Sequence, residues 1–140
     1  MRDVRAAPAC AARPPDFDAA RAAYVHEGPV AELLHRFKYA DRADLARPLV
    51  AALASIELPP VDLVAPVPLH ASRRRRRGYD QALYLAEAFA ALRDLPLAPT
   101  LLTRTRATAQ QVGQDRPARV QNVAEAFTAD PRAKGCSVVL

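Results

Sequence analysis

Residues 61–81 read VDLVAPVPLHASRRRRRGYDQ, and this stretch decides the fold that we predict. It begins with VDLVAPV, a short and nearly continuous apolar run, which is typical of a strand buried on both faces. Pro66 and Pro68 lack backbone donors, so the chain has to leave the sheet there. We expect the five arginines that follow, residues 73–77, to form a loop with Gly78 as its hinge.

The residues after this loop predict a helix from Gln81 to Arg93, with Asp80 well placed as its N-cap. A helix N-terminus offers unpaired N–H groups and a partial positive charge, and arginine side chains bind phosphate oxygens with two parallel bonds. In an open α/β sheet, ligands lie beyond the carboxyl ends of the strands, where this loop would be. Strand, arginines and helix start together predict a phosphate or pyrophosphate site. The alternative is a solvated basic loop.

Weaker patterns on either side complete the α/β fold that we predict. Apolar residues at 30, 33, 34 and 37 are spaced for one face of a helix, and a second helix around 45–53 starts or kinks near Pro48. Residues 103–121 are polar and without apolar periodicity, and they predict either a loop that closes over a substrate or a surface connection. The remaining candidates are strands at 22–26, 97–102 and 136–140 and a short mixed element at 123–128.

Length and composition indicate one globular domain, since the chain has 140 residues of which 51% are hydrophobic. The net charge is +5, from 20 Lys and Arg against 15 Asp and Glu, and without the five arginines of 73–77 the balance would be 15 against 15. The chain is therefore neutral apart from one anion-seeking spot, which argues against a broad nucleic-acid footprint. No apolar stretch could span a bilayer, no signal peptide is recognisable, and the two cysteines make no disulfide framework, so we expect a cytoplasmic protein.

Several catalytic motifs are absent from the sequence. It has no Walker-type Gly-Lys-Ser/Thr loop, no Gly-x-Gly-x-x-Gly, no His-Glu-x-x-His and no Gly-x-Ser-x-Gly. His26, His35 and His70 lie far apart without metal-ligand spacing, so we expect exposed or hydrogen-bonded side chains and no metal bound by the protein.

Taken in order, the remaining motifs resemble those of the ComF family, competence-associated proteins that are similar to type I phosphoribosyltransferases. The resemblance covers residues 20–140. It rests on Lys38-Tyr39, Pro66-Val67-Pro68-Leu69-His70, Arg73, Arg77-Gly78-Tyr79-Asp80-Gln81, Arg104-Thr105-Arg106, Thr108, Gln111, Arg119, Asn122 and Ala126-Phe127.

The resemblance implies a type I phosphoribosyltransferase-like fold, a parallel sheet flanked by helices, and a role in DNA uptake or nucleotide salvage. Such enzymes displace pyrophosphate from phosphoribosyl pyrophosphate (PRPP) with a nitrogen nucleophile and Mg²⁺, so PRPP or pyrophosphate is the expected ligand. The protein would contribute positioning and charge neutralisation. The implied pyrophosphate-binding residues are His70, Arg73, Arg77, Gly78 and Gln81. The implied catalytic cations, on a lid over the site, are Arg104, Arg106 and Arg119, with Thr108, Gln111 and Asn122 on the same loop.

Three departures from the family pattern matter. Asp80 stands where the family usually has Asn, which places a negative charge beside the predicted anion site. Residues 1–18 resemble an irregular remnant of the family's zinc ribbon, because Ala7 replaces the partner that Cys10 would need, and no zinc is expected. The domain at 19–140 ends inside the strand that leads, in the family, to the PRPP-binding loop. We therefore expect a C-terminally incomplete domain that is inactive in transfer as it stands.

A second interpretation is a sequence-independent nucleic-acid-binding accessory module of the DNA-uptake machinery, with single-stranded DNA or a DNA-uptake helicase as partner. The arginine loop would contact phosphates without reading bases, and binding would weaken with salt. Aromatic residues are only 6% of the chain, and the lack of a stacking platform argues against strong single-strand recognition. A third interpretation is a degenerate protein that binds neither ligand. No membrane insertion is expected in any of them.

Overall fold

The computed structural model describes residues 16–40, 42–71, 74–75, 78–106 and 123–140. This part of the chain is mixed helix and strand, with two small sheets. Its helices are α2 (Gly28–Tyr39), α3 (Ala46–Ala51) and α5 (Gln81–Arg93), with 3₁₀ turns η2 (Ala43–Leu45) and η3 (Pro131–Ala133). Its strands are β1 (Leu63–Val64), β2 (Leu102–Arg104), β3 (Phe127–Ala129) and β4 (Val138–Val139).

β1 is the strand around which the parallel pairing is built, as the apolar run at 61–67 predicts. It pairs in parallel with β4, with Val64 opposite Val139. On its other side Val64 makes a parallel bridge to Leu97, with two backbone hydrogen bonds of 2.8 and 2.9 Å. Val64 is 2% exposed and Ala65 is fully buried, so the buried strand is confirmed at its centre, but it spans Leu63–Val64 rather than 61–67, and Val67 is 42% exposed.

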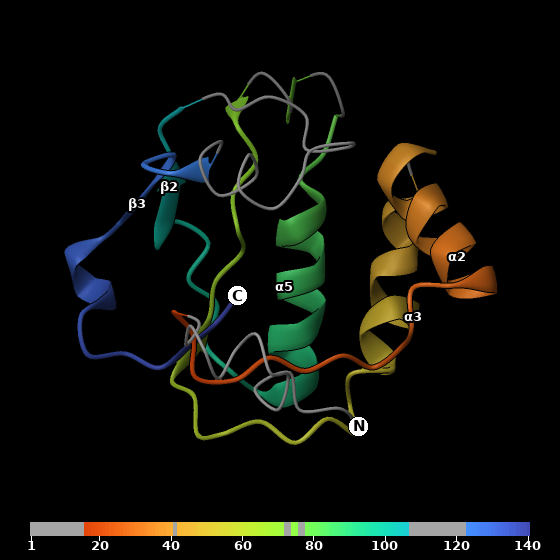
Figure 1. Cartoon of the computed structure of the whole chain (residues 1–140), viewed down its shortest axis with the longest axis horizontal. Coiled ribbons are helices and arrows are strands. Elements are labelled where there is room, and N and C mark those ends of the chain that lie inside the picture. Colours follow the sequence, from red (N-terminus) through yellow and green to blue (C-terminus); the bar gives the residue numbers. More distant parts are fainter. Residues whose placement is uncertain (1–15, 41, 72–73, 76–77, 107–122) are drawn as a thin grey trace, which may run out of the picture.

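A second, antiparallel pair is formed by β2 and β3, with Thr103 opposite Thr128. The strand predicted at 97–102 is therefore divided between two partners. Leu97 bridges to β1, whereas Leu102 begins β2. In Figure 1 the β2–β3 pair lies on one side of the β1 segment and α5 lies on the other.

The helix α5 has the predicted bounds, Gln81–Arg93, and lies between the β1 segment and the α2–α3 pair (Figure 1). Burial of apolar side chains between these layers is the main stabilising term of the fold. The cluster that fills them comes from α3, β1 and α5 and consists of Val50, Val64, Ala86, Phe89 and Ala90.

The two helices before β1 follow from local sequence. α2 begins at Gly28-Pro29, since proline is tolerated in the first helical turn, and it buries Phe37, which is 1% exposed. α3 is a short helix whose third residue is Pro48, so the proline again falls in the first turn and does not kink the helix. None of the helices in the described ranges combines the length and the apolar character that crossing a bilayer requires.

The strand predicted at 22–26 is wrong, because these residues form bends and an irregular segment. Tyr24 is 58% and Val25 71% exposed, so the apolar side chains that suggested a strand are not covered. An isolated extended segment gains neither ladder hydrogen bonds nor burial, and hence does not remain a strand.

Candidate anion-binding site

The segment between β1 and α5 leaves the sheet at the predicted prolines. Its last residue, Asp80, lies close to Leu69 near its beginning. The backbone N–H of Leu69 donates to Oδ2 of Asp80 at 3.5 Å, eleven residues further along the chain. Asp80 therefore closes the base of this segment, which carries the arginine run. For the rest of this article we call residues 69–80 the arginine loop.

Within the arginine loop, the described arginines have helical backbone rather than the irregular one that we predicted. The Arg74 N–H donates to His70 O at 3.1 Å, and the Gly78 N–H donates to Arg74 O at 2.9 Å. Arginine is a good helix former, in keeping with the helical backbone of Arg74 and Arg75. Gly78 has a φ of +80°, which ends the turn in a conformation that other residues adopt at a cost.

Asp80 is the N-cap of α5, as predicted, and it uses both of its carboxylate oxygens. Oδ1 accepts hydrogen bonds from the backbone N–H groups of Ala82 (3.1 Å) and Leu83 (3.4 Å), while Oδ2 accepts from Leu69. The N–H of Tyr84 is bonded to the Asp80 carbonyl. The free N–H groups that the sequence argument assigned to a bound anion are thus already occupied by a carboxylate.

The residues on either side of Asp80 fasten the arginine loop to the end of α2. The Tyr79 hydroxyl donates to the Phe37 carbonyl, and Nε2 of Gln81 donates to the Lys38 carbonyl at 2.6 Å. Both carbonyls belong to the last turn of α2, where a helix has no internal donors for them. The Tyr79 and Phe37 rings also meet edge to face, 6.2 Å apart. We call the Tyr79 and Gln81 contacts the α2 clasp.

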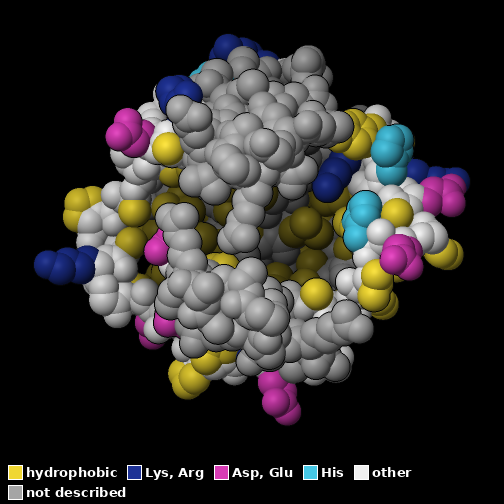
Figure 2. Space-filling view, in the orientation of Figure 1, with side chains coloured by type: hydrophobic (Ala, Val, Ile, Leu, Met, Phe, Trp, Pro, Cys, Tyr) yellow, Lys and Arg dark blue, Asp and Glu magenta, His cyan; other side chains and the backbone are white. Residues whose placement is uncertain are grey.

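The described cationic side chains of this region are Arg74, Arg75 and Lys38, and all three are exposed. Figure 2 shows the Lys and Arg side chains of the described residues at several separate places on the face in view, with apolar side chains at the floor of its central hollow. The described cations are therefore not gathered into one patch on this face.

The first two predicted lid cations lie at the end of the β2–β3 pair. Arg104 lies over the Phe127 ring, 5.1 Å from its centre, and its Nε donates to the Arg106 carbonyl. Nη2 of Arg106 donates to the Ala124 carbonyl at 2.7 Å. These contacts hold together residues 104–106 and 124–127, the two chain segments that flank residues 107–122.

The structure places the predicted site residues in two groups. His70, Gly78 and Gln81 belong to the arginine loop and the start of α5, whereas Arg104 and Arg106 belong to the β2–β3 pair. Gln81 is 7% exposed and its amide is used in the α2 clasp, so a contact with pyrophosphate would have to replace or share that bond. The other predicted residues, Arg73, Arg77, Thr108, Gln111, Arg119 and Asn122, lie outside the described residues.

A metal site does not emerge from the residues that the structure describes, where no three His, Cys, Asp or Glu side chains are grouped as ligands. Asp80 is the carboxylate at the arginine loop, and it is turned to backbone N–H groups. The residues described here therefore do not fit a magnesium ion held by the protein itself. Mg²⁺ usually reaches phosphate sites on the phosphates of the ligand.

Sequence reasoning missed the role of Tyr79 and the meeting of α2 with α5. The Gln81–Lys38 bond joins residues 43 positions apart, and no local pattern signals such a pair. The available signal was that Lys38-Tyr39 and Gly78–Gln81 both stood out as motifs.

Comparison with curated proteins finds relatives along most of the chain. "DNA utilization protein YhgH" of Salmonella typhi is 27% identical over 139 residues, which are 94% of this chain and 61% of the relative. "Competence protein F" of Haemophilus influenzae is 32% identical over 110 residues, which are 71% of this chain and 47% of the relative. The chain thus spans about half to three fifths of the length of these relatives. No family model matches the chain, and no solved structure matches it significantly.

Proposed function

Because the chain belongs to the ComF family, we propose that its arginine loop binds pyrophosphate or the pyrophosphate group of a phosphoribosyl donor such as PRPP. The observation that carries this proposal is the closure of the loop. A run of five arginines is held between the end of β1 and the start of α5, with its base tied by Leu69 and Asp80. A loop fixed at both ends loses less conformational entropy when it binds a ligand than a free basic tail does.

The chemistry of the loop suits a compact polyanion. Arginine side chains remain charged at all relevant pH values and offer a planar fork of donors that matches phosphate oxygens. Arg74 and Arg75 are exposed at the loop, and in the described ranges each salt bridge joins other residues. Mg²⁺ would accompany the ligand and neutralise part of its charge. The proposal concerns binding, since nothing in the described residues marks an acceptor for phosphoribosyl transfer.

The experiment compares single arginine replacements by isothermal titration with inorganic pyrophosphate and with PRPP, with and without Mg²⁺. We expect Arg77→Ala to abolish saturable binding, because it removes a bidentate partner next to Gly78. Arg47→Ala is the matched control, since Arg47 is an exposed arginine of α3, outside the arginine loop. Equal affinities for wild type, Arg77→Ala and Arg47→Ala would contradict the proposal.

A second candidate function is sequence-independent binding of single-stranded nucleic acid in DNA uptake. The names of the relatives, which refer to DNA utilization and competence, support it. The exposed Arg74 and Arg75 would then contact backbone phosphates. In that case no single arginine matters much. The slope of log K against log salt should instead become shallower by about 0.7–0.9 for each phosphate contact removed.

A further inference from the structure

We propose that α2 is a movable arm of the fold, which opens as a unit when the α2 clasp is released. In the open state α2 has left the start of α5, whereas β1, α3 and α5 stay packed together. The inference goes beyond the proposed function, because it rests on described contacts of α2 and needs no ligand at the arginine loop.

The helix α2 contributes little to the apolar core of the described fold. The buried cluster comes from α3, β1 and α5, and the apolar side chains packed against it also belong to segments other than α2. Within α2, Phe37 is the buried residue, whereas Val30, Leu33 and Leu34 are partly exposed. Figure 1 shows α2 at the edge of the molecule, outside α3. An element with few buried apolar contacts opens at a lower free-energy cost than the core does.

The two ends of α2 are anchored unequally. At the N-terminal end the side chain of the N-cap residue, Glu27, makes no capping hydrogen bond, and residues 24–29 are all exposed. At the C-terminal end Nε2 of Gln81 donates to the Lys38 carbonyl at 2.6 Å, and the Tyr79 hydroxyl donates to the carbonyl before it. A helix that is held mainly at one end by a few side-chain bonds is released when those bonds break.

The start of α5 does not depend on α2 for its cap. Asp80, which lies between the two clasp residues in the sequence, caps the helix through the backbone N–H groups of Ala82 and Leu83. This cap remains when α2 leaves, and the Tyr79 hydroxyl and the Gln81 amide then lose their partners in α2. A molecule that accepts hydrogen bonds from either group in the open state competes with α2 and shifts the population toward that state.

The experiment is native-state hydrogen exchange, measured by mass spectrometry at several low urea concentrations. In wild type we expect the α2 amides to exchange faster than those of α5 and to depend less on urea, because a smaller surface is exposed when α2 opens alone. Tyr79→Phe keeps the ring and removes the hydroxyl donor, and it should speed up exchange of α2 about three- to tenfold, the effect of one hydrogen bond. Tyr84→Phe is the matched control, since Tyr84 is 41% exposed and its ring meets that of Tyr79.

Three results would overturn the inference. In wild type, α2 could exchange no faster than α5 and with the same dependence on urea, which would mean that it opens only with the whole fold. Tyr79→Phe could speed up α2 and α5 equally, or it could leave α2 as unchanged as Tyr84→Phe does. Gln81→Met, which removes the other clasp donor, repeats the test if Tyr79→Phe does not fold. None of these results bears on pyrophosphate binding, which Arg77→Ala tests separately.

Discussion

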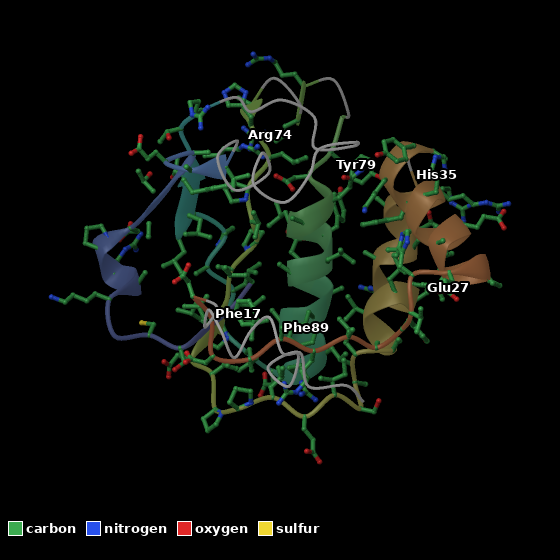
Figure 3. All side chains as sticks on the ribbon, viewed as in Figure 1. Phe17, Glu27, His35, Arg74, Tyr79 and Phe89 are labelled. Carbon is green, nitrogen blue, oxygen red and sulfur yellow. The ribbon has the colours of Figure 1, made fainter. Side chains whose placement is uncertain are left out.

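The two ends of α5 are fastened to the rest of the protein by opposite means. At the N-terminal end, two side chains make the contacts. The buried amide of Gln81 donates to a carbonyl of α2, and the carboxylate of Asp80, which precedes the helix, accepts from the first turn of α5. At the C-terminal end, a single side chain of the helix, Arg93, donates to the carbonyls of Ala54 (2.9 Å) and Ile56 (2.6 Å). Figure 3 labels Tyr79 near the first end and Phe89 in the half of α5 that leads to the second.

This difference suggests that the C-terminal end of α5 has a structural role, whereas the N-terminal end belongs to the candidate site. The guanidinium of Arg93 lies at the negative end of the helix dipole, and it donates hydrogen bonds to carbonyls of the connection between α3 and β1. At the other end a carboxylate lies where the dipole is positive, and Arg74 and Arg75, which precede it by six and five residues, are exposed and take part in no salt bridge among the described residues. Under the proposed function, the N-terminal end is the one at which a ligand would use positive charge.

The largest effect should come from removing the aromatic side chain that anchors each end. Phe37, under the α2 clasp, and Phe89, near the other end, are 1% and 7% exposed. We expect Phe37→Ala and Phe89→Ala each to lower the free energy of unfolding by about 3–5 kcal/mol, measured by urea denaturation. Because a small domain can lose its fold at such a cost, Phe37→Leu and Phe89→Leu provide milder versions. A loss below about 1 kcal/mol at Phe37 would show that α2 is not anchored by the clasp region.

The next effect distinguishes the two ends by function. Gln81→Leu leaves the Lys38 carbonyl without this donor and should cost about 1–3 kcal/mol, since a part-buried acceptor loses its partner. Arg93→Met removes one exposed and one part-buried bond and should cost about 1–2 kcal/mol. We expect both variants to lower Tm, whereas only Gln81→Leu weakens pyrophosphate binding at a temperature at which both are folded. A loss of binding in Arg93→Met of the same size would remove the functional distinction between the ends.

The smallest effect compares Asp80 with a capping carboxylate that does have a cation. Arg132 hydrogen-bonds to Asp130 and lowers the pKa of that carboxyl from its ordinary 3.8 to about 2. A depressed folded pKa means that this pair stabilises the fold above pH 3.8 and loses its contribution as the pH falls toward about 2. The Arg132 side chain is exposed and the Asp130 side chain is partly exposed, so the change in stability will be small. In an NMR titration, Arg132→Gln should return the Asp130 pKa toward 3.8, and an unchanged pKa would contradict this account.

The parts of the fold that sequence predicted are those governed by neighbours along the chain. The bounds of α5 followed from the spacing of its apolar residues and from Asp80, whose side chain caps the first turn. The buried character of β1 followed from an apolar run between prolines. Both depend on interactions within a few residues, which the sequence displays directly.

The parts that sequence reasoning missed depend on partners distant in the chain. The family resemblance implied that Gln81 binds pyrophosphate, but the bond from its amide to the Lys38 carbonyl of α2, 43 positions away, was not predicted. Capping by Asp80 and anion binding by the helix N-terminus were both predicted, although the same N–H groups cannot fully serve both. An irregular loop was predicted from the charge of the arginines, without weighing their high helix propensity, and the described Arg74 and Arg75 are helical.

The parallel pairing of β1 with β4 has a consequence for synthesis of the protein. Asp62 and Ser137, which bond beside this pair, are 75 positions apart. At about 5–20 residues per second, the ribosome needs roughly 4–15 s to supply the partner of β1 after β1 itself has been made. During that interval the edge of an apolar strand is open to other chains, and the prolines at 59, 60, 66 and 68 stand on both sides of it as gatekeepers against aggregation.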